Sequence, residues 1–445
     1  MEQDLGFQLA YQRGIQAVIW GMPAVNIASL RQATFRDIGA RYNDIIYMSN
    51  LAEPRHELLT ACNRAPYVLV MLNVKKGPVV FEVPPATAKA AFCGCAADAW
   101  LVPLADIGPA GDDAGRGGRY LFLPPGYKNG VPDGYLPVPS KTYNVHIAVR
   151  PLANAGETLS LGDAVAHSKR LRAYPLALAD RSPANRYIDA YPKAWRTLPI
   201  YDMSYFETLA QIIDEEPLQE KDAAMIGLLA SIGIQKGTPF LPQGKLARAL
   251  ELAVKDARRQ MEHYFETPGL ATAPYRPDSQ WMAGNATPQE SATYLVDGRL
   301  LIDERAGGNT YWSTFRPKKP GKGVFALRAL RDSSGQLLKG TSLYRLRIPR
   351  DVPVSDSWAV TVYGKESKSY VANDLNRVEL SSRDPLRENA DGSVDLYFGP
   401  QPSVGREPNW IPTASRDFFL IFRFYGPEEA VFDRSFKLPD VEKVY

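Results

Sequence analysis

Hydrophobic and polar positions follow two different periods along this chain, and the period changes three times. Residues 7–37 carry apolar side chains at helical spacing, and the sequence WGMP at Trp20–Pro23 predicts a break or kink there. Between about residues 64 and 151, short apolar or alternating runs are separated by Gly and Pro, which is typical of antiparallel strands. Helical spacing returns over 158–265, and strand-like alternation resumes after about residue 273. The pattern predicts an α+β, β-rich fold.

Two distant stretches resemble each other. Arg119–Pro151 and Val394–Pro427 both read as a strand, a Pro/Gly-rich loop and a long strand that ends at Pro, and an ungapped alignment places Phe122 on Phe398. We therefore predict two antiparallel β-sandwiches of similar topology on either side of a helical insert. The expected domains are an N-terminal helical region at 1–60, a first β-sandwich at 61–152, a helical linker segment at 153–272 and a second β-sandwich at 273–445.

Composition and charge exclude several classes of protein. The 52 basic and 49 acidic residues leave a net charge of +3, and they are mixed along the chain, so we expect no nucleic-acid partner. No window approaches the roughly 18 uncharged apolar residues that a membrane-spanning helix needs. The N-terminal residues lack the features of a signal peptide. As written, the chain is expected to be cytoplasmic; if a signal peptide has been removed, the protein is periplasmic or secreted.

Familiar catalytic and cofactor motifs are absent from the sequence. It contains no H-E-x-x-H, no G-x-S-x-G elbow, no P-loop and no G-x-G-x-x-G after a strand, so no cofactor is predicted. Three Cys residues, Cys62, Cys93 and Cys95, argue against a disulfide framework. With only four His residues and no ligand-rich spacing, we predict no metal site.

Particular segments carry a family resemblance. The C-terminal half resembles domain of unknown function 1214, through DSSGQLLKGTSLYRLRIPRDVPVSDSWAVTVYG, NADGSVDLYFGPQP, NWIPT and FFLIFRFYGP. The N-terminal part resembles the usual companion of that domain, domain of unknown function 1254, through WGMP, YVLVMLNVKKGPVVFEVP, DAW and YNVHIAVRP. The resemblance spans almost the whole chain. It implies paired jelly-roll-like sandwiches, often in symmetric oligomers, so a homo-oligomer (a dimer or a tetramer) is expected, but it implies no settled reaction.

The chain departs from the family pattern at two places. Where the family pattern usually has Asn-Asp-Thr followed by Leu-Tyr, this chain has NRAPY: Asn63 and Tyr67 fit, but Arg64 replaces the acid and Ala65 the hydroxyl residue. A Trp that the family pattern implies is replaced by His146. Both changes suit an altered ligand, and Asn63 and Tyr67 are candidate walls of its pocket.

Two residues of the N-terminal half are candidates for proton transfer. His146 lies in the middle of a strand and points opposite to Val145 and Ile147, either into a pocket or into a core where its nitrogens are satisfied. Asp98 lies at a strand end beside Trp100, where the loops of a sandwich gather, and the alternative is an Asp that caps a turn. Trp100 is a further candidate for substrate contact.

A second set of candidates lies near the C-terminus. Asn409 and Trp410 fall between strands, while Arg423 and Tyr425 share one face of a strand. Together they suit a ligand that bears a carboxylate or a ring, with Arg423 as anion anchor. The alternative is that Trp410 fills the edge of the sandwich and Arg423 pairs with a surface acid.

These features favour an enzyme that acts on a small organic molecule in a cleft at the sandwich or domain interface. Because no cofactor motif is present, cofactor-independent hydrolase or lyase chemistry with acid–base groups is the simplest expectation. The alternative is a non-catalytic ligand-binding or oligomeric assembly protein, since sandwich folds serve both purposes. Metal-assisted hydrolysis is a third, less supported, hypothesis.

Overall fold

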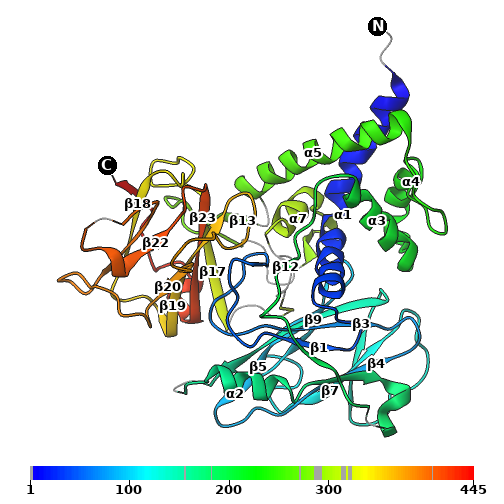
Figure 1. Cartoon of the computed structure of the whole chain (residues 1–445), viewed down its shortest axis with the longest axis horizontal. Coiled ribbons are helices and arrows are strands. Elements are labelled where there is room, and N and C mark those ends of the chain that lie inside the picture. The colour runs from blue at the N-terminus through cyan, green and yellow to red at the C-terminus, as the bar shows by residue number, and fades with distance from the viewer. Residues whose placement is uncertain are drawn as a thin grey trace. The chain divides into compact units, whose positions relative to one another are not determined.

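The structure is a computed structural model, and it describes residues 4–154, 157–181, 183–269, 272–284, 293–311, 317–318, 323–402 and 404–444 (Figure 1). The chain divides into two compact units. Unit 1 consists of Met1–Leu51, Ala65–Thr267 and Ala292–Lys318, and unit 2 of Ala52–Arg64, Pro268–Ser291 and Lys319–Tyr445. In the described part of the chain, no helix has the length and apolar character that a membrane crossing requires.

Unit 1 contains two sheets that share one apolar core. The larger has the strand order β11-β1-β3-β9-β5-β6 and the smaller β10-β4-β7-β8. Val70 and Ile147 of the larger sheet and Phe81 and Phe122 of the smaller one belong to the same buried cluster. The strands are β1 (Ile45–Tyr47), β3 (Val68–Asn73), β4 (Val79–Val83), β5 (Ala90–Asp98), β6 (Pro103–Ile107), β7 (Gly118–Leu123), β8 (Tyr135–Pro139), β9 (Asn144–Ala153), β10 (Arg172–Pro175) and β11 (Tyr187–Asp189).

Most helices of unit 1 pack around a second apolar core. Side chains of α1, α3, α4, α5 and α7 form it. Helices α1 and α5 approach closely because Gly14 has no side chain: a Cβ there would lie 2.7 Å from the Ala253 Cβ. The helices are α1 (Leu5–Asp37), α2 (Leu161–Ser168), α3 (Met203–Glu215), α4 (Ala223–Ala230), α5 (Gly244–Glu266) and α7 (Ile302–Asn309), with 3-10 turns η1 (Leu176–Arg181) and η2 (Glu220–Asp222) and short strands β12 (Trp195–Arg196), β15 (Leu295–Val296) and β16 (Arg299–Leu300).

Helix α1 continues through WGMP, where the sequence predicted a break or a kink, so the break does not occur. It runs for 33 residues with Pro23 inside it. A proline lacks the N–H that would bond the preceding turn. In that turn the Trp20 carbonyl accepts a hydrogen bond from Arg305 at 2.8 Å. The carbonyl that loses its donor at Pro23 is that of Ile19, four residues earlier, and the helix continues although this one backbone bond is missing.

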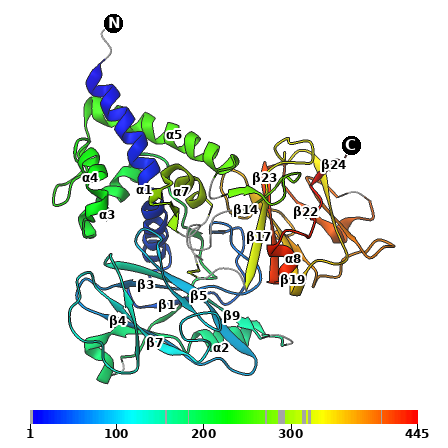
Figure 2. The ribbon, with the colours of Figure 1, turned by 180° about the vertical axis from the view of Figure 1, so that it is seen from behind.

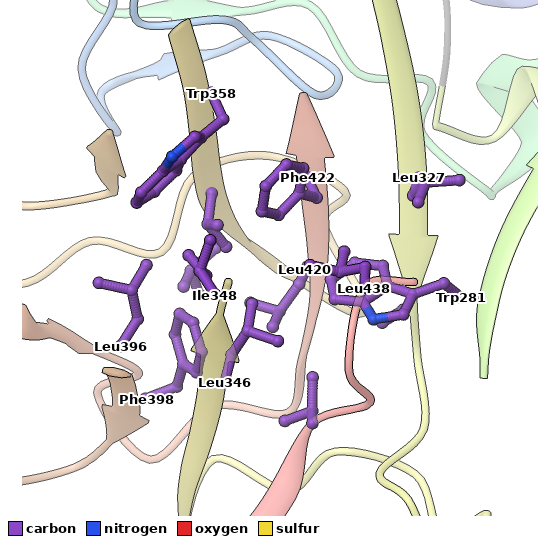
Figure 3. Close-up of a cluster of buried hydrophobic side chains, with 14 of the residues drawn as sticks. Trp281, Leu327, Leu346, Ile348, Trp358, Leu396, Phe398, Leu420, Phe422 and Leu438 are labelled. Atoms are coloured by element: carbon purple, nitrogen blue, oxygen red, sulfur yellow. The ribbon is translucent and has the colours of Figure 1, made fainter. Parts of the chain in front are cut away.

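Unit 2 also contains two sheets around one core. The larger has the order β13-β14-β17-β23-β19-β20 and the smaller β22-β21-β18-β24. Phe422 and Leu420 of the larger sheet lie in one buried cluster with Leu346 and Phe398 of the smaller (Figure 3). The elements are β2 (His56–Glu57), β13 (Thr272–Pro274), β14 (Trp281–Gly284), β17 (Val324–Ala329), β18 (Leu343–Ile348), β19 (Val354–Gly364), β20 (Glu379–Ser381), β21 (Val394–Gly399), η3 (Glu407–Asn409), β22 (Trp410–Pro412), β23 (Phe418–Pro427), α8 (Glu429–Phe432) and β24 (Glu442–Val444).

The strand order of unit 1 recurs in unit 2. The run β3-β9-β5-β6 corresponds to β17-β23-β19-β20, and β10-β4-β7-β8 corresponds to β24-β18-β21-β22. In both units the Pro/Gly-rich loop joins two parallel neighbours, β7 with β8 and β21 with β22. The chain is therefore α+β and rich in sheet, as predicted, and its main sheets are open rather than closed barrels.

The ungapped alignment of the two halves is wrong beyond the loop. Phe122 and Phe398 both face the core of their unit, as the alignment requires. The same alignment places the core residue Ile147 on Arg423, which alternates with the core residues Phe422 and Phe424. Since a shift of one residue turns every side chain of a strand to the other face, the second strands match only if the loop contains a gap.

Candidate functional site

A small buried cavity lies on the face of the larger sheet of unit 1 that points away from the core between the sheets. On β9, Val145, Ile147 and Val149 belong to that core, so His146 points to the opposite face. There α1 and α3 cover the sheet. The cavity between these helices and the sheet measures about 20 Å³, which is room for about one water molecule. Its apolar walls are Ala24, Ile27, Ala28, Met71 and Ile212, and its polar groups are Arg31, Asp98, Asn144, His146, Glu215 and Glu216.

His146 brings an unsatisfied imidazole to this cavity. It is 2% exposed, and within the described residues neither ring nitrogen has a hydrogen-bond partner. Burial lowers the pKa of His146 from its usual 6.5 to about 3, so the ring is neutral at pH 7. A neutral imidazole offers one donor and one acceptor. The donor and the acceptor of His146 both lack a partner in the described part of the protein.

Asp98 brings a buried carboxylate from the end of β5. One of its oxygens accepts hydrogen bonds from the backbone N–H groups of Trp100 at 2.8 Å and Val102 at 2.9 Å. These bonds fit the turn-capping reading of the sequence. Even so, burial raises the pKa of Asp98 to about 6, close to the range in which a general acid or base works best.

Glu216, the residue after α3, is a second buried carboxylate. It accepts from the Tyr143 N–H at 2.5 Å, from the Asn144 N–H at 3.0 Å and from the Asn144 side chain at 2.6 Å. Burial raises the pKa of Glu216, and these three donors oppose that rise. The carboxylate therefore holds the first residue of β9 in place, two positions before His146.

Asn144 connects the polar groups around the cavity. Its side-chain oxygen accepts from the Tyr42 hydroxyl at 2.7 Å and from Asn73 at 3.0 Å. Its side-chain nitrogen also donates to Glu215 at 3.1 Å, and Glu215 in turn accepts from Arg31 at 2.7 Å. Arg31 thus offsets one of the negative charges around the cavity.

Sequence reasoning selected Asp98 and His146 but missed Glu216, Asn144 and the Arg31–Glu215 pair. One signal was available for Glu216. The acidic pair that follows IID lies at the C-terminal end of a predicted helix, where the helix dipole favours cations. An acid in that position needs local donors, and the structure supplies them from the start of β9.

Two further candidates of unit 1, Trp100 and Tyr67, do not line the cavity. The Trp100 ring packs on Trp20 of α1, with ring centroids 4.4 Å apart. Tyr67 is buried, and the guanidinium of Arg150 lies 5.4 Å from the centre of its ring. Within the described residues, no group of three or more His, Cys, Asp or Glu side chains is arranged to hold a metal ion.

Arg423 and Tyr425 lie on the outer face of the larger sheet of unit 2. Arg423 donates to the Thr361 hydroxyl at 3.0 Å and to the Thr60 carbonyl at 3.1 Å, so its guanidinium is held by the protein itself. The Tyr425 hydroxyl and the Cys62 Sγ are 2.9 Å apart. Within the described residues Arg423 forms no ion pair with a surface acid, which was the alternative that the sequence left open.

Residues 63 and 64 also belong to unit 2. The Asn63 backbone hydrogen-bonds to Glu379. Arg64, at the position where the family resemblance implies an acid, forms an ion pair with Asp356, donates to Ser357 at 2.5 Å and lies over the Tyr425 ring. The departure from the family pattern therefore creates contacts within the protein. Asn63 and Tyr67, proposed as walls of one pocket, belong to different units.

Asn409 ends the 3-10 turn η3 and Trp410 begins β22 of the smaller sheet of unit 2, whereas Arg423 is in the larger sheet. The Asn409 side chain donates to the Arg387 and Asp395 carbonyls at 2.8 and 2.9 Å. Trp410 is 8% exposed, and its Nε1 donates to the Gly399 carbonyl at 3.1 Å. It pairs with Tyr397, whose neighbours Leu396 and Phe398 face the core, so Trp410 is on the outer face of this sheet. The structure does not bring Trp410 together with Arg423 and Tyr425.

Two family models match the chain. "Protein of unknown function (DUF1254)" matches residues 42–175, and "Protein of unknown function (DUF1214)" matches residues 323–429. The chain belongs to the paired DUF1254–DUF1214 family. This confirms the resemblance seen in the sequence. Asp98 and His146 of this DUF1254–DUF1214 protein fall inside the DUF1254 match, whereas Arg31, Glu215 and Glu216 fall outside both matches. Among curated proteins, none matches the chain.

Solved structures resemble this DUF1254–DUF1214 protein over nearly its full length. The crystal structure of the VPA0106 protein from Vibrio parahaemolyticus has a TM-score of 0.59 at 18% identity, and the match covers 98% of this chain and 100% of that one. A putative uncharacterized protein from Burkholderia cenocepacia matches at a TM-score of 0.41 and 11% identity, over 98% of this chain and 94% of that one. At 18% identity, the likeness to the VPA0106 protein shows the fold.

Proposed function

We propose that this DUF1254–DUF1214 protein is an enzyme that acts on a small organic molecule through cofactor-independent acid–base chemistry of the hydrolase or lyase type. One observation carries the proposal. Asp98 and His146 come from different strands, line one buried cavity, and have pKa values that burial moves in opposite directions. Ionisable groups perturbed in this way concentrate at catalytic sites.

The two groups take different roles in this proposal. Asp98, with a pKa of about 6, is mostly ionised at pH 7 and accepts a proton from the substrate or from water. His146 is neutral and donates a hydrogen bond to the oxygen on which negative charge develops. Glu216 and Asn144 position the start of β9, so they act through His146 rather than on the substrate.

The cavity is large enough for a water molecule but too small for an organic substrate. At about 20 Å³ it holds about one water molecule, the co-reactant of a hydrolase. An organic substrate enters only when the helices that cover the sheet move apart, as lids do in many enzymes. Entry past α1 or α3 would separate Arg31 from Glu215, because this ion pair joins the two helices.

We also propose that each unit is a jelly-roll-like β-sandwich and that the protein is a cytoplasmic homo-oligomer, a dimer or a tetramer. The shared core and the recurring strand order of each unit support the first point. The division into a helical region at 1–60, sandwiches at 61–152 and 273–445, and a helical linker segment at 153–272 remains a proposal. Strands β10 and β11 from this linker extend the sheets of unit 1.

Substrate discovery followed by mutation tests the catalytic proposal. Wild-type protein is incubated with a mixture of small esters, amides, lactones and hydroxy acids, and mass spectrometry identifies compounds that are consumed. Asp98→Asn and His146→Asn should each reduce that turnover at least a hundredfold at an unchanged melting temperature. Asp106→Asn is the matched control: Asp106 is a buried acid of the same sheet that does not line the cavity. Wild-type turnover in both cavity variants would refute the assignment.

A non-catalytic role is the second candidate, and the small cavity favours it. About 20 Å³ of space, with walls tied by hydrogen bonds, also suits a structural water beneath α1 and α3. In that case the protein binds a ligand or assembles with further copies, without turnover. Saturable binding of a small molecule that is recovered unchanged, with equal affinity in Asp98→Asn, would support this candidate over the enzyme.

A further inference from the structure

A second hollow lies beside α2, at the other end of β5 from Asp98. Figures 1 and 2 both show α2 next to this sheet. The hollow measures about 340 Å³, and it lies between the residues that lead into β5, from Thr87 to Ala90, and α2. That volume is in the usual range for small-molecule sites. Ala90 and Asp98 are at opposite ends of β5, about 26 Å apart at roughly 3.3 Å per residue, so this is a separate place from the cavity described above.

The charges around this hollow are mainly positive. Lys89 and Arg170 both line it, and within the described residues neither forms an ion pair with a carboxylate. The carboxylate that lines the hollow, Asp163, accepts a hydrogen bond from the Ser160 hydroxyl at 2.9 Å. Two cations that converge on one hollow without a carboxylate partner attract an anion.

His167 adds a buried ring whose donor and acceptor nitrogens can be assigned. It is 5% exposed, and its ring stacks on Phe92 with centroids 4.4 Å apart. Its Nδ1 lies 3.4 Å from a nitrogen of Arg170. Because a guanidinium can only donate, Nδ1 must accept in this contact, which places the proton of the neutral ring on Nε2.

That Nε2–H group has no acceptor among the described residues. Burial and the nearby Arg170 charge lower the pKa of His167, so at pH 7 the ring is neutral and its single proton is on Nε2. A buried donor without an acceptor is costly, and it is satisfied when an oxygen atom binds next to it. Lys89, Arg170 and His167 thus line the same hollow, together with the carboxylate of Asp163.

We propose that this hollow binds the oxyanion group, a carboxylate or a phosphate, of a small molecule. Arg170 and Lys89 supply the charge, the His167 ring supplies a neutral donor, and Phe92 fixes the orientation of that ring. The site is independent of the catalytic proposal, since none of its residues lines the cavity that contains Asp98 and His146.

Imidazole ¹⁵N NMR on the full-length protein tests this site, because the chain has only four His residues to assign. Inorganic phosphate and acetate are titrated separately at constant ionic strength. We expect a saturable shift of the His167 nitrogens with at least one anion, and unchanged His146 signals. Saturation by phosphate alone identifies a phosphate-bearing ligand, and saturation by acetate alone a carboxylate-bearing one.

Two variants and one control complete the test. Arg170→Gln and Lys89→Met should each weaken the anion about tenfold, the loss expected when one charge-assisted contact is removed. Lys193→Met, at an exposed lysine that does not line the hollow, should leave the affinity unchanged. Retention of the His56, His146 and His263 signals shows that each variant is folded. No saturable His167 shift with either anion, or equal affinity in wild type and Arg170→Gln, overturns the proposal.

Discussion

Replacing His146 with leucine should make the protein more stable while it removes the proposed activity. The wild-type ring is buried, and neither nitrogen is bonded within the described residues. A buried polar group without a partner costs about 1–3 kcal/mol, and an apolar side chain of similar size does not carry that cost. His146→Leu should therefore raise the free energy of unfolding by about 1–3 kcal/mol at pH 8.

The gain should increase as the pH falls. The pKa of His146 is lowered from 6.5 to about 3 in the folded protein. Below pH 6.5 the unfolded chain takes up a proton on this ring that the folded chain does not bind until about pH 3, so the folded state loses stability across that interval. At pH 5 the loss is about 2 kcal/mol, and leucine abolishes it. The difference between variant and wild type should thus be about 2 kcal/mol larger at pH 5 than at pH 8.

Urea unfolding of both proteins at pH 5 and pH 8 measures this difference. His263→Leu is the matched control, because it makes the same substitution at a histidine that is exposed on α5 in the same unit. A His146→Leu protein that is less stable than wild type at both pH values would refute the reasoning. It would mean that bound water satisfies the ring so well that the imidazole is a net stabiliser.

Three other predictions concern single positions. If Asp98 accepts the proton, turnover rises with pH and levels off above an apparent pKa of about 6, which a pH–rate profile measures; a flat profile contradicts this role. Gly14→Ala should lower the melting temperature, because overpacking against Ala253 costs about 1–3 kcal/mol, whereas Gly227→Ala, in open space on α4, should raise it by helix propensity alone. Trp410→Phe loses the indole hydrogen bond and about 1 kcal/mol of stability in chemical denaturation, and ligand binding should be unchanged.

The local pattern of the sequence predicted most of the sheet. The runs of alternating residues became β3, β4, β5, β7 and β9 in unit 1 and their counterparts in unit 2, because alternation determines which side chains face a core. The same rule placed His146 opposite Val145 and Ile147, as the structure shows. Pro23 does not end α1, because the residues around it are packed into the apolar core of the helices, and tertiary packing contributes more to helix stability than the one backbone bond that proline removes.

The features of the candidate site that could not be predicted from the sequence depend on contacts between distant segments. No local pattern shows that the end of α3 meets the start of β9, and this contact brings Glu216 to Asn144. Equally, Trp410 and Arg423 are close in sequence, but the turn between them carries the chain from the smaller sheet to the larger one. Nearness along the chain was therefore a poor guide to which aromatic and charged residues share a site.

Arg423 shows most directly why a residue read as a ligand anchor can be structural. Its acceptor is the Thr60 carbonyl, in the segment Ala52–Arg64 that belongs to unit 2 although it precedes most of unit 1 in sequence. The same segment offers the Ala61 carbonyl to Tyr363 and the Cys62 thiol to Tyr425. A buried guanidinium is tolerated only with acceptors in place. The DUF1214 match at 323–429 lacks this segment, which lies inside the DUF1254 match. Unit 2 therefore contains residues from both family matches. A chain cut between the two matches would leave Arg423 without its backbone acceptor.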